Sequence, residues 1–274
     1  MRRLLPTSPD VTDLTTLEAL AEVYAYPPTT AAGPGPDGAV QPGTPWLRGN
    51  MVTSTDGASR LDGLSEGLSS SADKRIFGVL RALADVVLVG AGTVRAEGYR
   101  PARARPAFAA ERAARGQGPA PVIAVVSARL DLDLALPLFT EPAAGGAAGA
   151  AAARTVIVTC ANAPAEALKA AAGVADVVIA GEELVDPAVA VAALAERGWT
   201  RQLTEGGPSL LGQFAAAGVL DELCLSIAPL LVAGDSQRIA HGPKALAERL
   251  DLVALLEEKG FLFARYTRSV TNAA

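Results

Sequence analysis

The stretch TEGGPSLLGQF, residues 204–214, joins a strand-like segment to a helix-like one. Gly206 and Gly207 have no Cβ, so the backbone there can approach a ligand closely and can take positive φ. Pro208 suits the first position of a helix, whose free N–H groups and positive dipole end suit a phosphate. The stretch therefore predicts a strand–glycine–helix anion site. The alternative is a tight turn that only joins strand to helix.

In the sequence that precedes this stretch, short apolar segments of β type alternate with helical patterns. Strands that alternate with helices in this way form a mostly parallel central sheet flanked by helices, so the sequence predicts an α/β fold. Ser70 or Ser71 is expected to cap the first helix. The expected strands are 85–90, 121–127, 154–160, 176–180 and 199–204, and the expected helices are 72–84, 164–172, 187–197 and 208–217.

The last part of the sequence follows another pattern. Residues 221–232, 250–256 and 261–268 are expected to be strands, with no long helix between the last two. EKG at 258–260 is typical of a hairpin turn. The sheet should therefore end in an antiparallel C-terminal hairpin.

The segment before Trp46 differs from the rest. Residues 12–25 predict a short amphipathic helix, and residues 27–45 are rich in proline and glycine. Such a segment is typical of a tether because it has no apolar period. We therefore expect an N-terminal extension over 1–45 and one domain over 46–274. A second low-complexity patch, at 141–153, is expected to be a surface loop.

The composition indicates a globular protein with a sizeable core, since 50% of its 274 residues are hydrophobic and 19% are charged. The net charge of −5 argues against nucleic acid or an anionic membrane as partner, because those contacts need a basic face. No apolar run approaches the ~18 residues of a membrane-spanning helix. Pro6 and Asp10 interrupt the first apolar stretch too early for a signal peptide. We expect a cytoplasmic protein.

Few side chains suit a metal or a hydrolytic relay. Cys160 and Cys224 both lie among apolar residues and are expected to be buried, reduced thiols. The single histidine, His241, and two distant cysteines make a poor zinc set, so we expect no metal. A serine-hydrolase relay would also need a G-x-S-x-G elbow, which the sequence does not contain.

Two further segments are candidates for ligand binding. VLVGAGTVRAEGYRP, 87–101, follows an expected strand and contains G-x-G, but Arg95 stands at the third glycine position of a dinucleotide fingerprint. Thr93 could place its hydroxyl on a phosphate or an amide, and a plain turn is the alternative. The polar segment 51–75 is long, and a loop of this length is more often functional than idle. Asp56 within it is interpreted as a turn residue.

Three motifs, in this order, resemble one family. MVTSTDG at 51–57 is similar to M-x-x-S-x-D-G, and VLVGAGTVRAEG at 87–98 to VGxGTVxxD-D. LTEGGPSLLGQFAAAGVLDELCLSIAPLLVAG at 203–234 is similar to EGGPxL…L-x-x-G-L-V-D-E-L…I-A-P-x-L-x-G. The family is the NADPH-dependent reductase of riboflavin biosynthesis, found as the C-terminal domain of a bifunctional deaminase/reductase, with a dihydrofolate-reductase-like fold. The resemblance runs from about Trp46 to Arg268.

The resemblance implies hydride transfer from NADPH to a pyrimidine ribosylamine of the 5-amino-6-ribosylaminouracil 5′-phosphate type, whose ribose opens to a ribityl group. Glu205 would be the catalytic residue, hydrogen-bonding the heterocycle; charge compensation at the helix N-terminus is the alternative. The implied substrate contacts are Ser65, Arg81, Arg100, Arg103 and Glu205. The implied cofactor contacts are Val52, Thr93, Glu97, Ser127, Gly206, Gly207, Pro208, Ser209, Leu210 and Leu211. Arg129, two residues past Ser127, is our hypothesis for the 2′-phosphate, and hence for NADPH over NADH.

The sequence departs from the family pattern on the substrate side. Gly67 stands where the family has Trp, and Glu97-Gly98-Tyr99 stands for D-D-P. The second phosphate-binding Arg falls on Ala104, so Arg100, Arg103 or Arg105 would replace it, unless these are ordinary surface charges. No H-x-E…P-C-x-x-C zinc-deaminase pattern precedes Trp46, which predicts a stand-alone, actinobacterial-type pyrimidine reductase.

Because these changes spare the cofactor side, other interpretations of the function stay open. Dihydrofolate or another pterin is an alternative substrate, since the fold is shared and a pterin needs no ribose-phosphate clamp. An NADPH-binding protein without turnover is an alternative of another class. The expected partner is a small-molecule substrate, and the resemblance suggests a homodimer whose interface the apolar C-terminal strands could supply.

Overall fold

The computed structural model describes residues 1–7, 14, 16–31, 33–34, 40–41, 43–142 and 154–269. The protein forms two compact units, each assembled from separate segments. The first unit holds Met1–Ala25, Leu47–Leu80 and Glu205–Ala274, and the second holds Tyr26–Trp46 and Arg81–Thr204. Most of the predicted loop at 141–153 lies outside the described residues.

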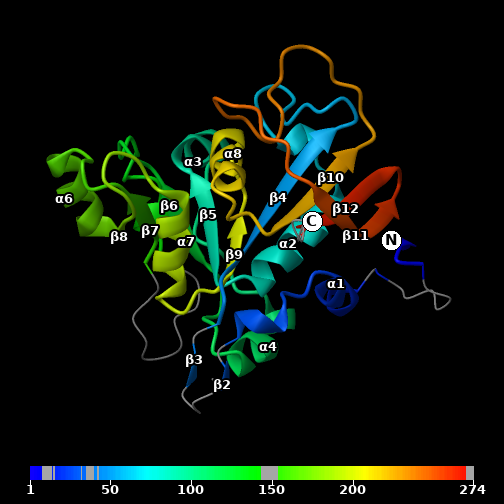
Figure 1. Ribbon diagram of the computed structural model, residues 1–274, viewed down its shortest axis with the longest axis horizontal. Coiled ribbons are helices and arrows are strands. Elements are labelled where there is room, and N and C mark those ends of the chain that lie inside the picture. The colour runs from blue at the N-terminus through cyan, green and yellow to red at the C-terminus, as the bar shows by residue number, and fades with distance from the viewer. Residues whose placement is uncertain are drawn as a thin grey trace, which may run out of the picture. The chain divides into compact units, whose positions relative to one another are not determined.

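The second unit is built on parallel strands, as Figure 1 shows. Their order is β9-β5-β6-β7-β8, and each neighbouring pair is parallel. The side chains of β5 are apolar without alternation, and Val86 to Val89 are fully buried, as expected for a parallel sheet covered on both faces. The strands are β5 (Val86–Gly90), β6 (Val122–Val126), β7 (Val156–Thr159), β8 (Asp176–Ile179) and β9 (Arg201–Thr204).

Helices connect these strands. Asp186 caps α7, since its Oδ1 accepts from the N–H groups of Ala188 and Val189. Ser70, one of the two predicted caps, precedes α2, and its Oγ accepts from Asp73 N at 3.1 Å. The remaining elements of this part of the protein are α2 (Ser71–Leu83, which runs from the first unit into the second), α3 (Ala91–Glu97), α4 (Ala109–Ala114), α5 (Pro137–Thr140), α6 (Ala165–Val174), α7 (Pro187–Ala195), the 3-10 turns η1 (Pro28–Thr30) and η3 (Pro106–Phe108), and the short strands β2 (Gly33–Pro34) and β3 (Val40–Gln41).

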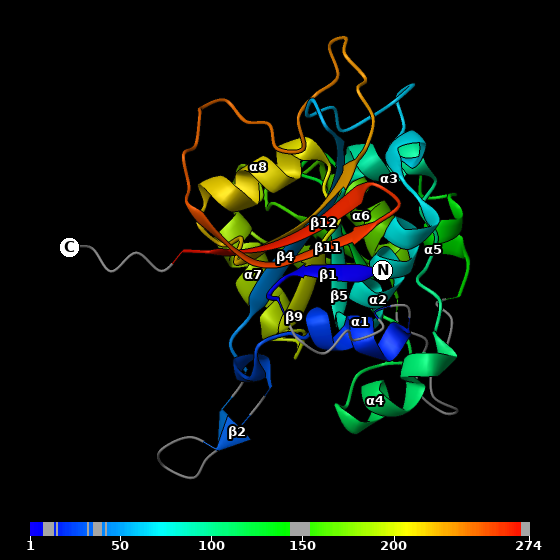
Figure 2. The same cartoon turned by 90° about the vertical axis from the view of Figure 1, so that its right-hand side faces the viewer.

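The first unit carries the antiparallel part of the fold. Its strand order is β1-β11-β12-β10-β4, with β10 and β4 parallel and the other pairs antiparallel. Figure 2 shows β1 beside β11. The strands are β1 (Arg2–Leu5), β4 (Trp46–Ser54), β10 (Glu222–Ala228), β11 (Leu250–Glu258) and β12 (Phe261–Arg268), and the helical elements are α1 (Leu17–Val23), η2 (Glu66–Leu68) and α8 (Pro208–Ala216).

The predicted C-terminal hairpin is confirmed, and its turn explains why. Lys259 has φ 52° and Gly260 has φ 83°, which is the pattern of the two central residues of a type I′ hairpin turn. The predicted fold class, a mostly parallel α/β sheet ending in an antiparallel hairpin, is therefore correct.

Two predicted boundaries move by four or five residues, and a helix that bears on the site was not predicted. β10 ends at Ala228, not at 232, because Pro229 has no N–H for a sheet ladder. The N-terminal helix begins at Leu17, where Thr16 Oγ1 accepts from Ala19 N. Residues 91–97 form a helix that was not predicted; Gly98 ends it in the left-handed conformation, with φ 63°. No helix in the described ranges is long and apolar enough to cross a membrane.

Candidate active site

The glycine turn of the opening stretch has the predicted form. Gly206 has φ +81°, a backbone angle that favours glycine, and a Cβ placed there would lie 3.0 Å from Sδ of Met51, whose side chain would have to shift. The Gly206–Gly207 peptide bond is cis. The N-cap position of α8 is Gly207, which has no side chain to cap the helix, and Pro208 occupies the first turn. The start of α8 therefore keeps backbone N–H groups available for an anion.

A loop segment packs along the same helix. The N–H of His241 donates to the carbonyl of Pro208 at 2.9 Å. A Cβ on Gly212 would lie 2.2 Å from the carbonyl oxygen of His241. Gly212 is thus required by a close backbone approach that the sequence did not predict. The lone histidine serves here through its backbone, and the described residues contain no cluster of three or more His, Cys, Asp or Glu suited to a metal.

Asp56 does more than form a turn. Its carboxylate accepts from Ser54 Oγ at 2.5 Å, from Val232 N at 3.2 Å and from Ala233 N at 2.6 Å. These hydrogen bonds, the one from Ser54 first, lower the pKa of Asp56 from 3.8 to about 2. Asp56 follows β4, the strand that carries Val52, and its carboxylate joins this segment to the loop after β10.

Replacing Asp56 by Asn should loosen this junction at neutral pH. Because the folded pKa is depressed, the charged form stabilises the fold above the ordinary pKa of 3.8, and this stabilisation is lost as the pH falls toward 2. Urea-unfolding midpoints of the wild type and Asp56→Asn should therefore differ near neutrality and converge in acid. Asp235→Asn, an exposed aspartate of the same loop, is the control. A difference that did not vary with pH would contradict this role of the carboxylate.

The loop that follows explains one departure from the family pattern. Ser65 immediately precedes η2 and is partly buried. Gly67 lies within η2, and a Cβ there would be 3.1 Å from Cβ of Leu61. A tryptophan at 67 would therefore require Leu61 to move. In this protein Leu61 covers the place that a larger side chain at 67 would need.

In the second unit, three predicted cofactor-binding residues follow the carboxyl ends of the neighbouring strands β5 and β6. Gly90 at the end of β5 pairs with Val126 at the end of β6. Thr93 and Glu97 lie on α3, which begins directly after β5, and Ser127 follows β6 and is buried. Ligands of α/β proteins bind outside the carboxyl ends of parallel strands. Thr93 and Ser127 therefore follow the strand ends at which ligands of such sheets bind.

The turn after Ser127 carries the hypothetical 2′-phosphate ligand. Arg129 is exposed, and Leu130 next to it has φ 54°. Arg95 of α3 donates to the backbone carbonyl of Asp131 at 2.5 Å and lies 3.3 Å from its carboxylate. α3 and this turn are thereby joined.

The predicted substrate arginines have different surroundings. The guanidinium carbon of Arg81, in the last turn of α2, lies 5.5 Å from the ring centroid of Tyr99. Arg100 forms an ion pair with Glu141 at 2.5 Å. Arg103 is exposed. The structure thus brings Arg81 to a residue, Tyr99, that stood out in the sequence only as a departure from the family pattern.

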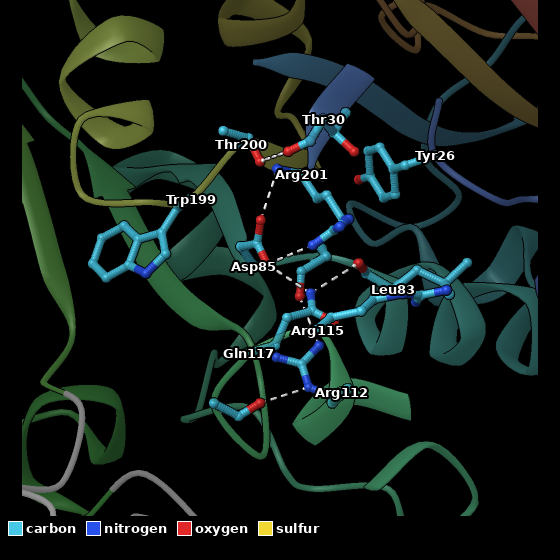
Figure 3. A network of polar contacts seen from close by, with 12 residues as sticks. Tyr26, Thr30, Leu83, Asp85, Arg112, Arg115, Gln117, Trp199, Thr200 and Arg201 are labelled. Carbon is cyan, nitrogen blue, oxygen red and sulfur yellow. Dashed lines mark hydrogen bonds and ion pairs between the residues drawn. The ribbon is translucent and has the colours of Figure 1, made fainter. Parts of the chain in front are cut away.

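A polar network lies at the opposite, amino ends of β5 and β9, and Figure 3 shows it. Asp85 Oδ2 accepts from Arg201 N at 2.8 Å, and Asp85 Oδ1 accepts from Gln117 Nε2 at 2.6 Å. Arg112 donates to the carbonyls of Ala82 and Ala84 at 2.7 Å each, and its burial lowers its pKa to about 10. Because it lies away from the carboxyl ends, this network is structural.

A second buried network explains the VLDEL part of the third motif. Glu222 is fully buried between two arginines, 2.7 Å from Arg48 Nε and 2.8 Å from Arg265 Nε. Arg48 also donates to the carbonyl of Tyr24, and Arg265 to that of Val23. Neighbouring Asp221 accepts from Leu47 N at 2.8 Å. Within the first unit, buried charges therefore hold the end of α1 to strands β4 and β12.

Taken one unit at a time, these features define an α/β protein with glycine turns and polar side chains at the carboxyl ends of parallel strands, the place of a nucleotide cofactor. The protein belongs to the RibD C-terminal domain family, whose model matches residues 45–259. The family resemblance inferred from the three motifs is thus confirmed. Cys160 and Cys224 are free and buried, as predicted.

The relatives carry informative names. A 2,5-diamino-6-ribosylamino-4(3H)-pyrimidinone 5′-phosphate reductase of Archaeoglobus fulgidus is 27% identical over 82% of this sequence and 99% of its own length. A protein of the same name from Aquifex aeolicus is 30% identical over 70% of this sequence and 79% of its own length. A pyrimidine reductase-like protein of Corynebacterium diphtheriae shares the fold with a TM-score of 0.73 and 26% identity, over 83% of this protein and 93% of that one.

Proposed function

We propose that this protein is a reductase that uses NADPH to convert a ribosylaminopyrimidine 5′-phosphate of riboflavin biosynthesis into its ribitylamino form. Membership of the RibD C-terminal domain family and the reductases named above support the reaction class. The observation that carries the cofactor is Gly206: its φ of +81° disfavours any residue with a Cβ just before a helix that has no side-chain cap. Such a turn suits a pyrophosphate.

The chemistry needs a hydride donor and an acceptor carbon held in contact. When bound, NADPH would supply a hydride to the C=N carbon of the ring-opened ribosylamine, and a proton taken up by the nitrogen from solvent would complete the ribitylamine. Backbone groups of Gly206–Leu211 are proposed to hold the pyrophosphate, and Val52, Thr93, Glu97 and Ser127 to contact the remainder of the cofactor. Glu205, which is buried, is proposed to hydrogen-bond the pyrimidine and support the acceptor nitrogen.

Other side chains are proposed to bind the substrate. Ser65 of the first unit and Arg81 and Arg103 of the second are the first candidates. Arg100 would have to release Glu141, which costs little because both side chains are about half exposed.

The pyrimidine itself distinguishes two versions of the proposal. The archaeal and Aquifex relatives are named for a substrate with an amino group at carbon 2, whereas the sequence prediction named the deaminated uracil. Absorbance of reduced nicotinamide should fall when the protein, NADPH and one of these pyrimidines are mixed. Turnover of both would mean that carbon 2 is not recognised. Turnover of dihydrofolate alone would contradict the proposal, and NADPH binding without any turnover would favour a non-catalytic role.

Preference for NADPH over NADH is proposed to depend on Arg129. A guanidinium can bind a phosphate through two parallel hydrogen bonds, and NADH lacks that phosphate. Arg129→Gln should reduce the ratio of kcat/KM for NADPH to that for NADH by about tenfold. Arg154→Gln, which removes an exposed arginine paired with Asp176, should leave the ratio unchanged. Equal use of both cofactors by the wild type would contradict the hypothesis.

The remaining predictions concern partners and location. We propose a homodimer that works on a small molecule in the cytoplasm, without nucleic acid or membrane. Leu252 and Val253 of β11, each 38% exposed, are apolar positions of the C-terminal strands that such an interface could cover.

A further inference from the structure

The turn that carries Arg129 contains charges of both signs. The segment SARLDLD, residues 127–133, holds one arginine and two aspartates. Leu130 is buried and has φ 54°, whereas Arg129 and Asp131 on either side of it are exposed. Two residues span at most about 7 Å of backbone, so Arg129 and Asp131 are anchored close together. A free carboxylate this near would oppose the binding of a phosphate by Arg129.

Arg95 of α3 engages this aspartate. Its Nη1 donates to the backbone carbonyl of Asp131 at 2.5 Å and lies 3.3 Å from Oδ2 of the Asp131 carboxylate. Asp133, the other aspartate of the turn, instead accepts from the backbone N–H of Ala135 at 2.9 Å. The partner of Asp131 therefore comes from a helix 36 residues earlier in the sequence, and it brings a second positive charge to this turn.

The exposure of this ion pair decides what it can do. The side chains of Arg95 and Asp131 are 47% and 83% exposed, and exposed pairs contribute little to the free energy of unfolding. Their charges still act on a ligand, because an uncompensated carboxylate repels a phosphate within the Debye length, about 8 Å at physiological ionic strength. The pair therefore matters more for binding than for folding, and its effect should be screened by salt.

We propose that Arg95 is a specificity-determining residue for the cofactor: it offsets the charge of Asp131 and thereby lets the turn at 127–131 accept the 2′-phosphate of NADPH. This inference rests on the proposed function, in which Arg129 binds that phosphate. NADH has no such phosphate, so Arg95 should matter for NADPH alone. The proposal also gives a role to the residue that interrupts the dinucleotide fingerprint.

Binding of two cofactor fragments isolates this effect. Adenosine 2′,5′-bisphosphate carries the 2′-phosphate, and adenosine 5′-monophosphate does not. In calorimetric titrations at low salt, Arg95→Gln should weaken binding of the bisphosphate about three- to fivefold, the size expected for one uncompensated exposed charge at this distance. Binding of the monophosphate should not change. The loss should vanish at about 0.5 M salt, where exposed charges are screened.

Two further variants separate the charge of Arg95 from its shape. Arg95→Gln combined with Asp131→Asn removes both charges and should bind the bisphosphate as the wild type does. Arg154→Gln breaks an ion pair with Asp176 at the amino ends of β7 and β8, where both side chains are also about half exposed, and should not alter binding of either nucleotide. Far-UV circular dichroism shows that each variant is folded.

Four results would overturn the proposal: an unchanged affinity of Arg95→Gln for the bisphosphate, an equal loss for the monophosphate, a loss that persists at high salt, or a double variant as weak as Arg95→Gln. A matching loss in Arg154→Gln would overturn it as well, since the effect would then be one of overall charge. So would a wild type that binds the bisphosphate no more tightly than the monophosphate.

The titrations need no turnover, which separates this proposal from the proposed function. A wild type that binds the bisphosphate as predicted but reduces no pyrimidine would refute the proposed function and leave the role of Arg95 intact. A wild type that reduces the pyrimidine, together with an Arg95→Gln variant of unchanged affinity, would do the reverse.

Discussion

Replacing Glu222 by glutamine should lower the free energy of unfolding by about 3–5 kcal/mol, the range seen when one partner of a buried ion pair is removed. The carboxylate is fully buried and contacts Arg48 and Arg265. Glutamine keeps the volume but leaves two guanidinium charges without their counter-charge. Because these arginines also bind carbonyls at the end of α1, the N-terminal segment should detach first.

The pH dependence of this effect has a defined sign. Burial alone raises the pKa of Glu222, but Arg48 and Arg265 outweigh it and the pKa is lowered. The stabilisation is therefore complete above the ordinary glutamate pKa and is lost as the pH falls through the depressed folded value. Urea unfolding at neutral and acidic pH measures both effects. Glu66→Gln, which breaks the exposed pair with Lys74, is the control and should leave the midpoint unchanged. A Glu222→Gln variant as stable as the control would contradict the account.

Replacing Glu205 by glutamine should lower kcat about 100-fold while the affinity for NADPH stays within about twofold, since positioned acid–base and hydrogen-bonding groups contribute effects of this size. Glu205 is buried and directly precedes the Gly206 turn. Glutamine has nearly the same shape, so the turn and α8 should be preserved. Steady-state kinetics with the pyrimidine and fluorescence titration with NADPH give the two quantities.

The alternative role of Glu205 predicts the reverse. A carboxylate that only compensates the positive end of α8 would compete with an anion there. Its loss would then strengthen NADPH binding, weaken the fold slightly and leave kcat nearly unchanged. Glu97→Gln, which changes a proposed cofactor contact, should mainly alter the KM for NADPH and so provides a matched comparison.

The sequence predicted the central strands because continuous apolar runs such as 86–89 have no other stable place than a covered parallel sheet. It also predicted the glycine turn, since Gly206 followed by Gly207 and Pro208 combines conformational freedom with a helix start. Both signals lie within a few consecutive residues, so the sequence alone is enough to detect them.

The contacts that the sequence did not predict join residues that lie far apart in the sequence. The motif around Glu222 gave no sign of its ion pairs with Arg48 and Arg265, which lie far from it in the sequence. Gly212 was a helix residue with a low propensity until the carbonyl of His241 was found 2.2 Å from the place of its Cβ. The cation–ring contact of Arg81 with Tyr99 and the ion pair of Arg100 with Glu141 were not predicted either. Such pairs follow from tertiary packing and leave no periodic trace.

The most direct test of the central claim follows the hydride itself. The protein would be incubated with the ribosylaminopyrimidine 5′-phosphate and NADPH carrying deuterium at carbon 4 of the nicotinamide, on each face in separate experiments. The account predicts that one of the two labelled cofactors gives a ribitylamino product with one deuterium on the former ribosylamine carbon. A product without deuterium from either cofactor, or no product while dihydrofolate is reduced, would contradict it.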